Sequence, residues 1–195
     1  RFDLKRGLLV FLAILAISLT YKFWLHSRAL PNTYFGDVGI SNKNFSELDQ
    51  VVKGRIAIFE NQPIILTVSG QNFQVEPREL GIKFNIQSTV NSIRTENRNP
   101  IAAIFRKHKI APEYLVDFGQ LTNKLNLLLA AYENPASDAT IVFNKGQFSI
   151  QEEKIGQVVD KSKLVADLRV RLENLSSEPV NVELIETQPK IGAGG

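Results

Sequence analysis

The chain has 195 residues, of which 44% are hydrophobic and 22% are charged, as is typical of a folded protein rather than a disordered one. Its formal net charge of +3 is too small to indicate nucleic acid as a partner. Cysteine is absent and His26 and His108 are the two histidines, which excludes disulfides and cysteine nucleophiles and leaves a zinc site almost no ligands. We therefore expect no metal and no cofactor.

The first element expected in chain order is a hydrophobic helix. Residues 7–21, GLLVFLAILAISLTY, carry no charge, and the next four residues, KFWL, extend the run to nineteen. At about 1.5 Å per residue, nineteen residues approach the ~30 Å hydrocarbon core of a bilayer. Lys22 can reach the headgroups, and Tyr21 and Trp24 suit the membrane interface. The pattern predicts a transmembrane anchor, with its cytoplasmic flank, over residues 1–30.

Two alternatives to an anchor are a buried helix of a soluble core and a signal peptide cleaved near Ser27-Arg28-Ala29. The lack of a polar stripe disfavours the buried helix. Arg1, Lys5 and Arg6 precede the run, against two basic residues after it, which favours an N-terminus inside the cell. We expect a single-pass protein of the bacterial cytoplasmic membrane, with membrane lipid as a partner and an extracytoplasmic ectodomain.

The body of the chain contains an internal repeat that begins with a helix. Residues 45–61, FSELDQVVKGRIAIFEN, match residues 118–134, FGQLTNKLNLLLAAYEN, with a shift of 73. The shared apolar positions step by three or four residues, which indicates an amphipathic helix in each copy. The aligned pairs are Phe45 with Phe118, Leu48 with Leu121, Val52 with Leu125, Ile56 with Leu129, and Phe59 with Tyr132.

The match continues between residues 64–93 and 139–168 with a shift of 75. Each copy predicts a β-hairpin, a tight turn that ends in glycine, a short strand and a second helix. Gly81 and Gly156 are expected at the two turns with positive φ, as turn residues rather than ligand contacts.

Two further aligned pairs fall inside these elements. Phe73 and Phe148 lie on the hairpins and are interpreted as hairpin core rather than as platforms that stack on glycans. Asn85 and Asp160 lie near the start of the second helix in each copy. After the second copy, residues 180–188 alternate apolar and polar positions and predict a closing strand.

The predicted fold class is α+β, with a single N-terminal transmembrane helix followed by two related helix–β-hairpin–helix repeats. The expected segments after the anchor are a first repeat over 31–96, a basic connector over 97–113, a second repeat over 114–190 and a glycine-rich linker or tail over 191–195.

The stretch between the copies, residues 94–112, has five basic residues against Glu96. This charge predicts contact with an anionic ligand, for which teichoic acid, stem-peptide carboxylates and lipid headgroups are candidates. A solvated basic face is the alternative. The candidate contact residues are Arg94, Arg98, Arg106, Lys107 and Lys109.

One ordered set of motifs runs through the second copy: Pro135-Ala136-Ser137-Asp138-Ala139, the hairpin with Phe148 and Ile150, Glu153-Lys154-Ile155-Gly156 and Val159-Asp160. This set resembles the peptidoglycan-binding domain that occurs in tandem in VanW-like proteins and ahead of some L,D-transpeptidase domains. The first copy, with Glu76-Pro77-Arg78-Glu79-Leu80-Gly81, resembles the degenerate leading repeat of the same proteins. The resemblance covers about residues 33–190 and implies an extracytoplasmic, membrane-anchored, non-catalytic module that binds peptidoglycan.

No enzyme activity is predicted. An L,D-transpeptidase needs a cysteine nucleophile, and the chain also lacks a Gly-x-Ser-x-Gly elbow and a phosphate-binding glycine loop. Two functions stay open: a module that binds or spans the cell wall, and a structural or accessory subunit of a membrane complex. The partners expected are peptidoglycan or an anionic wall polymer in the first case, and other subunits of the complex in the second.

Overall fold

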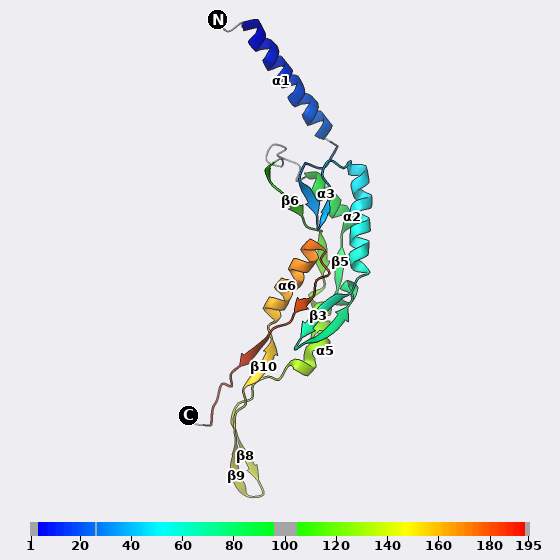
Figure 1. Ribbon diagram of the computed structural model, residues 1–195. Coiled ribbons are helices and arrows are strands. Elements are labelled where there is room, and N and C mark those ends of the chain that lie inside the picture. The colour runs from blue at the N-terminus through cyan, green and yellow to red at the C-terminus, as the bar shows by residue number, and fades with distance from the viewer. Residues whose placement is uncertain (1–3, 26, 96–104, 194–195) are drawn as a thin grey trace. The chain divides into compact units, whose positions relative to one another are not determined.

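The computed structural model describes residues 4–25, 27–95 and 105–193 (Figure 1). By their contacts the residues form two compact units, each a mixture of helices and small sheets, which agrees with the α+β part of the predicted class. The first unit comprises residues 1–58, 84–113 and 173–175, and the second comprises 59–83, 114–172 and 176–195.

The elements of the first unit, in chain order, are α1 (Leu4–Leu25), β1 (Thr33–Phe35), β2 (Val38–Gly39), α2 (Phe45–Glu60, the last two residues in the second unit), α3 (Ile86–Thr95) and β6 (His108–Ile110). Those of the second unit are β3 (Ile64–Val68), β4 (Gln71–Val75), the 3-10 helix η1 (Pro77–Leu80), β5 (Ile82–Phe84, the last residue in the first unit), β7 (Tyr114–Val116), α5 (Phe118–Leu129), the 3-10 helix η2 (Ala130–Tyr132), β8 (Thr140–Asn144), β9 (Gln147–Gln151), β10 (Gly156–Val159), α6 (Lys161–Asn174, the last two residues in the first unit), β11 (Val180–Asn181) and β12 (Leu184–Thr187).

The N-terminal helix corrects the sequence prediction. Within the residues that the structure describes, no helix is both long enough and apolar enough to cross a membrane. The uncharged run of α1 ends after fifteen residues, at Tyr21, and at 1.5 Å per residue it reaches only about 22 Å of the ~30 Å that a span requires. The predicted transmembrane helix and the single-pass membrane localisation are therefore wrong, whereas membrane lipid as a partner stays a prediction.

The core of the first unit forms between α2, α3 and the sheet β2-β1-β6. Leu48, Val52 and Ile56 lie one turn apart on α2 and are fully buried, as the helical spacing predicts. The strands β1 and β6 pair in parallel and place Phe35 beside Ile110. Both side chains are buried, so residues distant in the sequence complete one core.

The second unit holds a small sheet of order β11-β3-β4. The hairpin β3–β4 has a two-residue turn at Ser69-Gly70, both with positive φ, which matches the twist of the strands. The strand β11 pairs in parallel with β3 and sets Val180 beside Leu66, and both side chains are buried. This hairpin is therefore part of the core.

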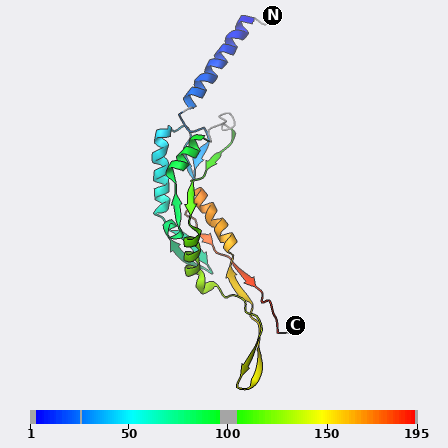
Figure 2. The same ribbon diagram turned by 180° about the vertical axis from the view of Figure 1, so that it is seen from behind.

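The hairpin β8–β9 has the same turn geometry, at Lys145-Gly146, but a different environment. All ten of its strand residues are exposed. Figures 1 and 2 show a two-stranded ribbon that projects without another element on either face. Its paired positions Ile141 with Ile150 and Phe143 with Phe148 put four large apolar side chains on one exposed face.

Both halves of the chain run helix, hairpin, short strand and helix, but two equivalences expected from the sequence do not hold. By turn position Ser69 corresponds to Lys145, so Phe73 and Phe148 are one residue out of register. Phe73 is half-buried with its ring 5.9 Å from that of Tyr132, whereas Phe148 is 77% exposed, so its interpretation as core is wrong. That the halves are copies of one repeat stays a prediction.

The two glycines expected at equivalent turns also differ. Gly81 has φ +71° and ends η1, as predicted. Gly156 is the first residue of β10 and its φ is outside the left-handed region, so the turn prediction for it is wrong. Its requirement for glycine is steric: a Cβ at Gly156 would lie 2.0 Å from the backbone nitrogen of Ala136.

Candidate functional site

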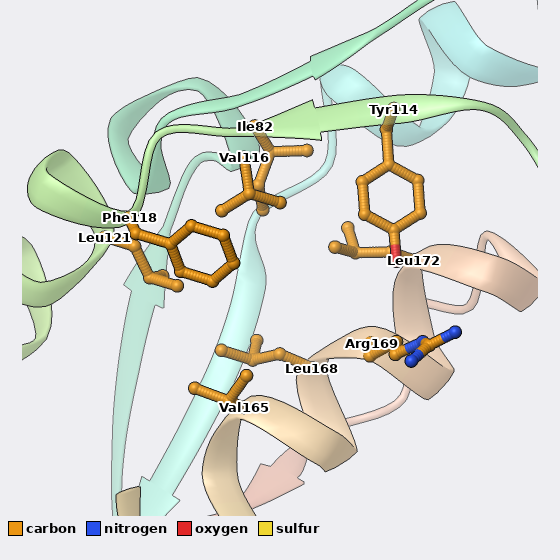
Figure 3. A pocket seen from close by; sticks show the side chains of 9 residues that line it. All are labelled: Ile82, Tyr114, Val116, Phe118, Leu121, Val165, Leu168, Arg169 and Leu172. Carbon is orange, nitrogen blue, oxygen red and sulfur yellow. The ribbon is translucent and has the colours of Figure 1, made fainter. Parts of the chain in front are cut away.

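The second unit contains a cavity of about 240 Å³ between the β5–β7 pair and the helices α5 and α6 (Figure 3). Seven of its nine lining residues have wholly apolar side chains. The lining residues are Ile82, Tyr114, Val116, Phe118, Leu121, Val165, Leu168, Arg169 and Leu172.

The junction between η1 and α5 forms one wall of the cavity. The left-handed Gly81 lets the chain turn directly into β5, whose Ile82 is buried in the wall. Asp117 is the N-cap of α5: its carboxylate accepts a hydrogen bond of 3.0 Å from the backbone N–H of Gln120. This cap fixes the start of α5, and with it Phe118 and Leu121.

The other wall is one face of α6. Asp160 accepts a hydrogen bond of 2.9 Å from the backbone N–H of Lys163, which places Asp160 at the start of α6, as the sequence predicted. Asn85 does the same for α3 through the N–H of Ser88. From this start, the spacing i, i+3, i+4 and i+7 brings a single face of α6 to the cavity. The four residues of that face are Val165, Leu168, Arg169 and Leu172.

The cavity is open to solvent beside Phe118 and Val165. Phe118 is 66% exposed and Val165 is 38% exposed, while Leu168 and Leu172 are buried and form the floor. Figure 3 shows Tyr114 and Phe118 on opposite sides, with the Tyr114 hydroxyl directed toward α6, the helix that carries Arg169. Among the lining side chains, Tyr114 and Arg169 bring the polar groups. The arrangement suits an apolar group that ends in a hydrogen-bond acceptor or an anion.

The basic residues predicted to contact an anion belong to the first unit and do not line this cavity. Arg94 lies 3.9 Å from the Asp49 carboxylate and 5.7 Å from the centre of the Phe45 ring. Lys107 lies over the Tyr34 ring at 5.8 Å, and Lys109 donates to the side-chain oxygen of Asn174 at 3.5 Å. Surface contacts of this kind stabilise a fold by only about 0–1 kcal/mol each.

Arg106, the fourth described member of the basic set, is exposed, and Arg98 lies outside the described residues. Anion contact by the connector stays a prediction.

Sequence reasoning placed Leu121 on the apolar face of an amphipathic helix and did not single out Arg169. A signal was present: Arg169 occupies the i+4 position of an otherwise apolar stripe that starts at Val165. A charged side chain within an apolar stripe indicates either a surface residue whose stem packs on the core or a group held beside a ligand site.

Comparison with known proteins shows the family of the chain. The sequence model of the family described as "Putative peptidoglycan binding domain" matches residues 73–181, more than half of the chain. The chain belongs to this family. No curated protein and no solved structure matches the chain.

The matched segment contains every residue that lines the cavity, from Ile82 to Leu172. It also confirms the peptidoglycan-binding part of the resemblance seen in the sequence. The tandem arrangement and the likeness to VanW-like proteins are not part of the match and stay predictions.

Proposed function

We propose that the chain binds peptidoglycan in the cell wall, through the cavity of its second unit, and that it catalyses no reaction there. One observation carries the proposal: the family match over residues 73–181 encloses the whole lining of the cavity. Apolar and aromatic walls with two polar groups can hold methyl groups or the apolar face of a sugar while the polar groups fix orientation.

Co-sedimentation of the purified chain with isolated peptidoglycan sacculi tests the proposal. The informative variant is Val165→Trp, because Val165 lines the cavity and is 38% exposed, so a larger ring can occupy the cavity while the helix stays folded. The matched control is Val170→Trp, on the same helix, 49% exposed and not among the lining residues.

We expect the wild type and Val170→Trp to sediment with sacculi and Val165→Trp to remain in the supernatant. Equal sedimentation of all three chains would show that peptidoglycan does not bind in the cavity. If the wild type does not sediment with sacculi, the proposal that the chain binds peptidoglycan is wrong. Sacculi recovered from the same tubes, digested and separated by chromatography, should show an unchanged set of fragments if the chain is not an enzyme.

A second function, contact with partner proteins as a structural subunit, is favoured by the exposed apolar face of the β8–β9 hairpin. Contiguous exposed apolar patches are typical of protein contact surfaces. Ile141, Phe143, Phe148 and Ile150 form such a patch. Sedimentation velocity over a range of concentrations tests whether this face joins two copies: association should be lost in the double variant Phe143→Ser and Phe148→Ser.

A further inference from the structure

We infer that the β8–β9 hairpin is a self-association site, at which two copies of this chain pack the apolar faces of their hairpins together. The inference deepens the second function proposed above, because it names a second copy of the chain as the partner. It does not depend on the cavity.

The first argument is that the two faces of the hairpin differ. The register sets Ile141 opposite Ile150 and Phe143 opposite Phe148, so that four side chains, between 62% and 77% exposed, share one face. The other face is polar except for Val142. An isolated two-stranded hairpin is at best marginally stable in water, and it needs further strands or packing on its apolar face. This face is therefore expected to meet another surface.

The second argument is charge. The two strands, TIVFN and QFSIQ, contain no charged residue and no proline. Exposed strands usually carry lysine or proline, which oppose pairing between molecules. Lys145 lies in the turn, outside both strands. Two copies of this face can therefore meet without bringing like charges together, whereas an anionic polymer would find no opposite charge on the strands.

The third argument is area. At about 150 Å² for each exposed large apolar side chain, the four side chains offer roughly 600 Å² per copy. A two-fold arrangement buries the same face on both copies, or about 1,200 Å² in total, which is the lower limit for a stable interface. We therefore expect a dissociation constant between about 1 μM and 1 mM. A dilute chain is then a monomer with an exposed hairpin, as in the structure.

NMR spectra of the methyl-labelled full chain, recorded over a dilution series, test the inference. The methyl signals of Ile141 and Ile150 report on the apolar face of the hairpin. Those of Ile14 and Ile17 report on α1, whose apolar side chains are also exposed. The two groups of signals distinguish association through the hairpin from association through α1.

The test variant is the double substitution Phe143→Thr and Phe148→Thr. Both side chains are exposed, and threonine is β-branched and suits a strand, so the hairpin should keep its backbone. The matched control is Val142→Thr, which makes the same kind of change on the opposite face of β8.

Between about 10 μM and 1 mM, a range that spans the expected dissociation constant, the signals of Ile141 and Ile150 should shift with concentration in the wild type and in Val142→Thr. In the double variant they should not depend on concentration. The inference is wrong if the wild-type signals stay constant, if the dependence survives in the double variant, or if Ile14 and Ile17 alone respond. It is also wrong if the hairpin signals shift only when soluble peptidoglycan fragments are added, because the polymer then covers this face.

Co-sedimentation with sacculi separates this inference from peptidoglycan binding. The hairpin residues do not line the cavity, so the double variant should sediment with sacculi as the wild type does. If the hairpin signals do not depend on concentration but the wild type sediments, self-association is wrong and peptidoglycan binding stands. If neither is observed, both are wrong.

Discussion

The backbone N–H of Asp117 donates a hydrogen bond of 3.0 Å to the carbonyl oxygen of Gly81. The same glycine has φ +71°, and a Cβ on it would lie 2.9 Å from both the Cβ and the carbonyl oxygen of Asp117. Asp117 in turn caps α5. A turn that only glycine fits is thus joined to the start of a helix that forms the cavity wall.

Replacing Gly81 tests this junction. Gly81→Ala adds left-handed strain, on the order of 1–3 kcal/mol, and also a steric clash with Asp117. Gly70→Ala is the control, because Gly70 has φ +80° but a Cβ added to it would meet nothing within 4 Å. Urea denaturation should show a larger loss of unfolding free energy for Gly81→Ala. Equal losses would mean that the contact with Asp117 is easily relieved.

Gly156 is required for a different reason, the close approach of the backbone. A Cβ there would lie 2.0 Å from the nitrogen of Ala136 and 2.5 Å from the hydroxyl of Thr187, so Gly156→Ala should push β10 away from its neighbours. Gly54→Ala, in α2 with open space around it, should stabilise the chain by about 0.5–1 kcal/mol. Thermal melts of the two variants should shift in opposite directions, and a rise for Gly156→Ala would contradict the geometry.

The helices were predictable because their signal is local. The stripe of Leu121, Leu125 and Leu129 can be seen in the spacing alone, and all three side chains are buried. The environment of the hairpins was not predictable, because it depends on a distant strand. The sequence around Phe148 is as apolar as that around Phe73, yet only the β3–β4 hairpin has β11 beside it.

The candidate site was less predictable than the helices. Its lining comes from β5, β7, α5 and α6, and no continuous motif joins Ile82 to Leu172. The high density of basic residues predicted a site in the connector, whereas Arg169 is a single charge on an apolar face of α6.

The contrast between the hairpins gives a stability prediction. Phe148→Ser should change the free energy of unfolding by less than about 1 kcal/mol, since the ring is 77% exposed and mainly contacts Phe143, 4.8 Å away between ring centres. Leu125→Ala should cost about 2–5 kcal/mol, because Leu125 is buried in the core of the second unit. Guanidinium unfolding curves measure both. A large loss for Phe148→Ser would mean that the hairpin is covered in solution.

The segment after β12 should respond to acid. The backbone N–H of Ala193 donates to the Glu153 carboxylate at 2.8 Å and holds the pKa of that carboxyl below its usual range. Because the folded pKa is lowered, the contact is fully present above the ordinary glutamate pKa of about 4.3 and is lost as the pH falls through the lower, folded value. An NMR titration should show the Ala193 amide shifting together with the Glu153 carboxyl. In Glu153→Gln the acid-dependent shift of Ala193 should disappear; its persistence would assign the shift to another group.

The most direct measurement is an NMR titration of the methyl-labelled chain with soluble peptidoglycan fragments. Binding in the cavity should shift the methyl signals of Val116, Leu168 and Leu172, and should leave those of Ile141 and Val142 on the exposed hairpin unchanged. Shifts confined to the hairpin or to the first unit, or no shift at millimolar fragment, would contradict peptidoglycan binding by the cavity.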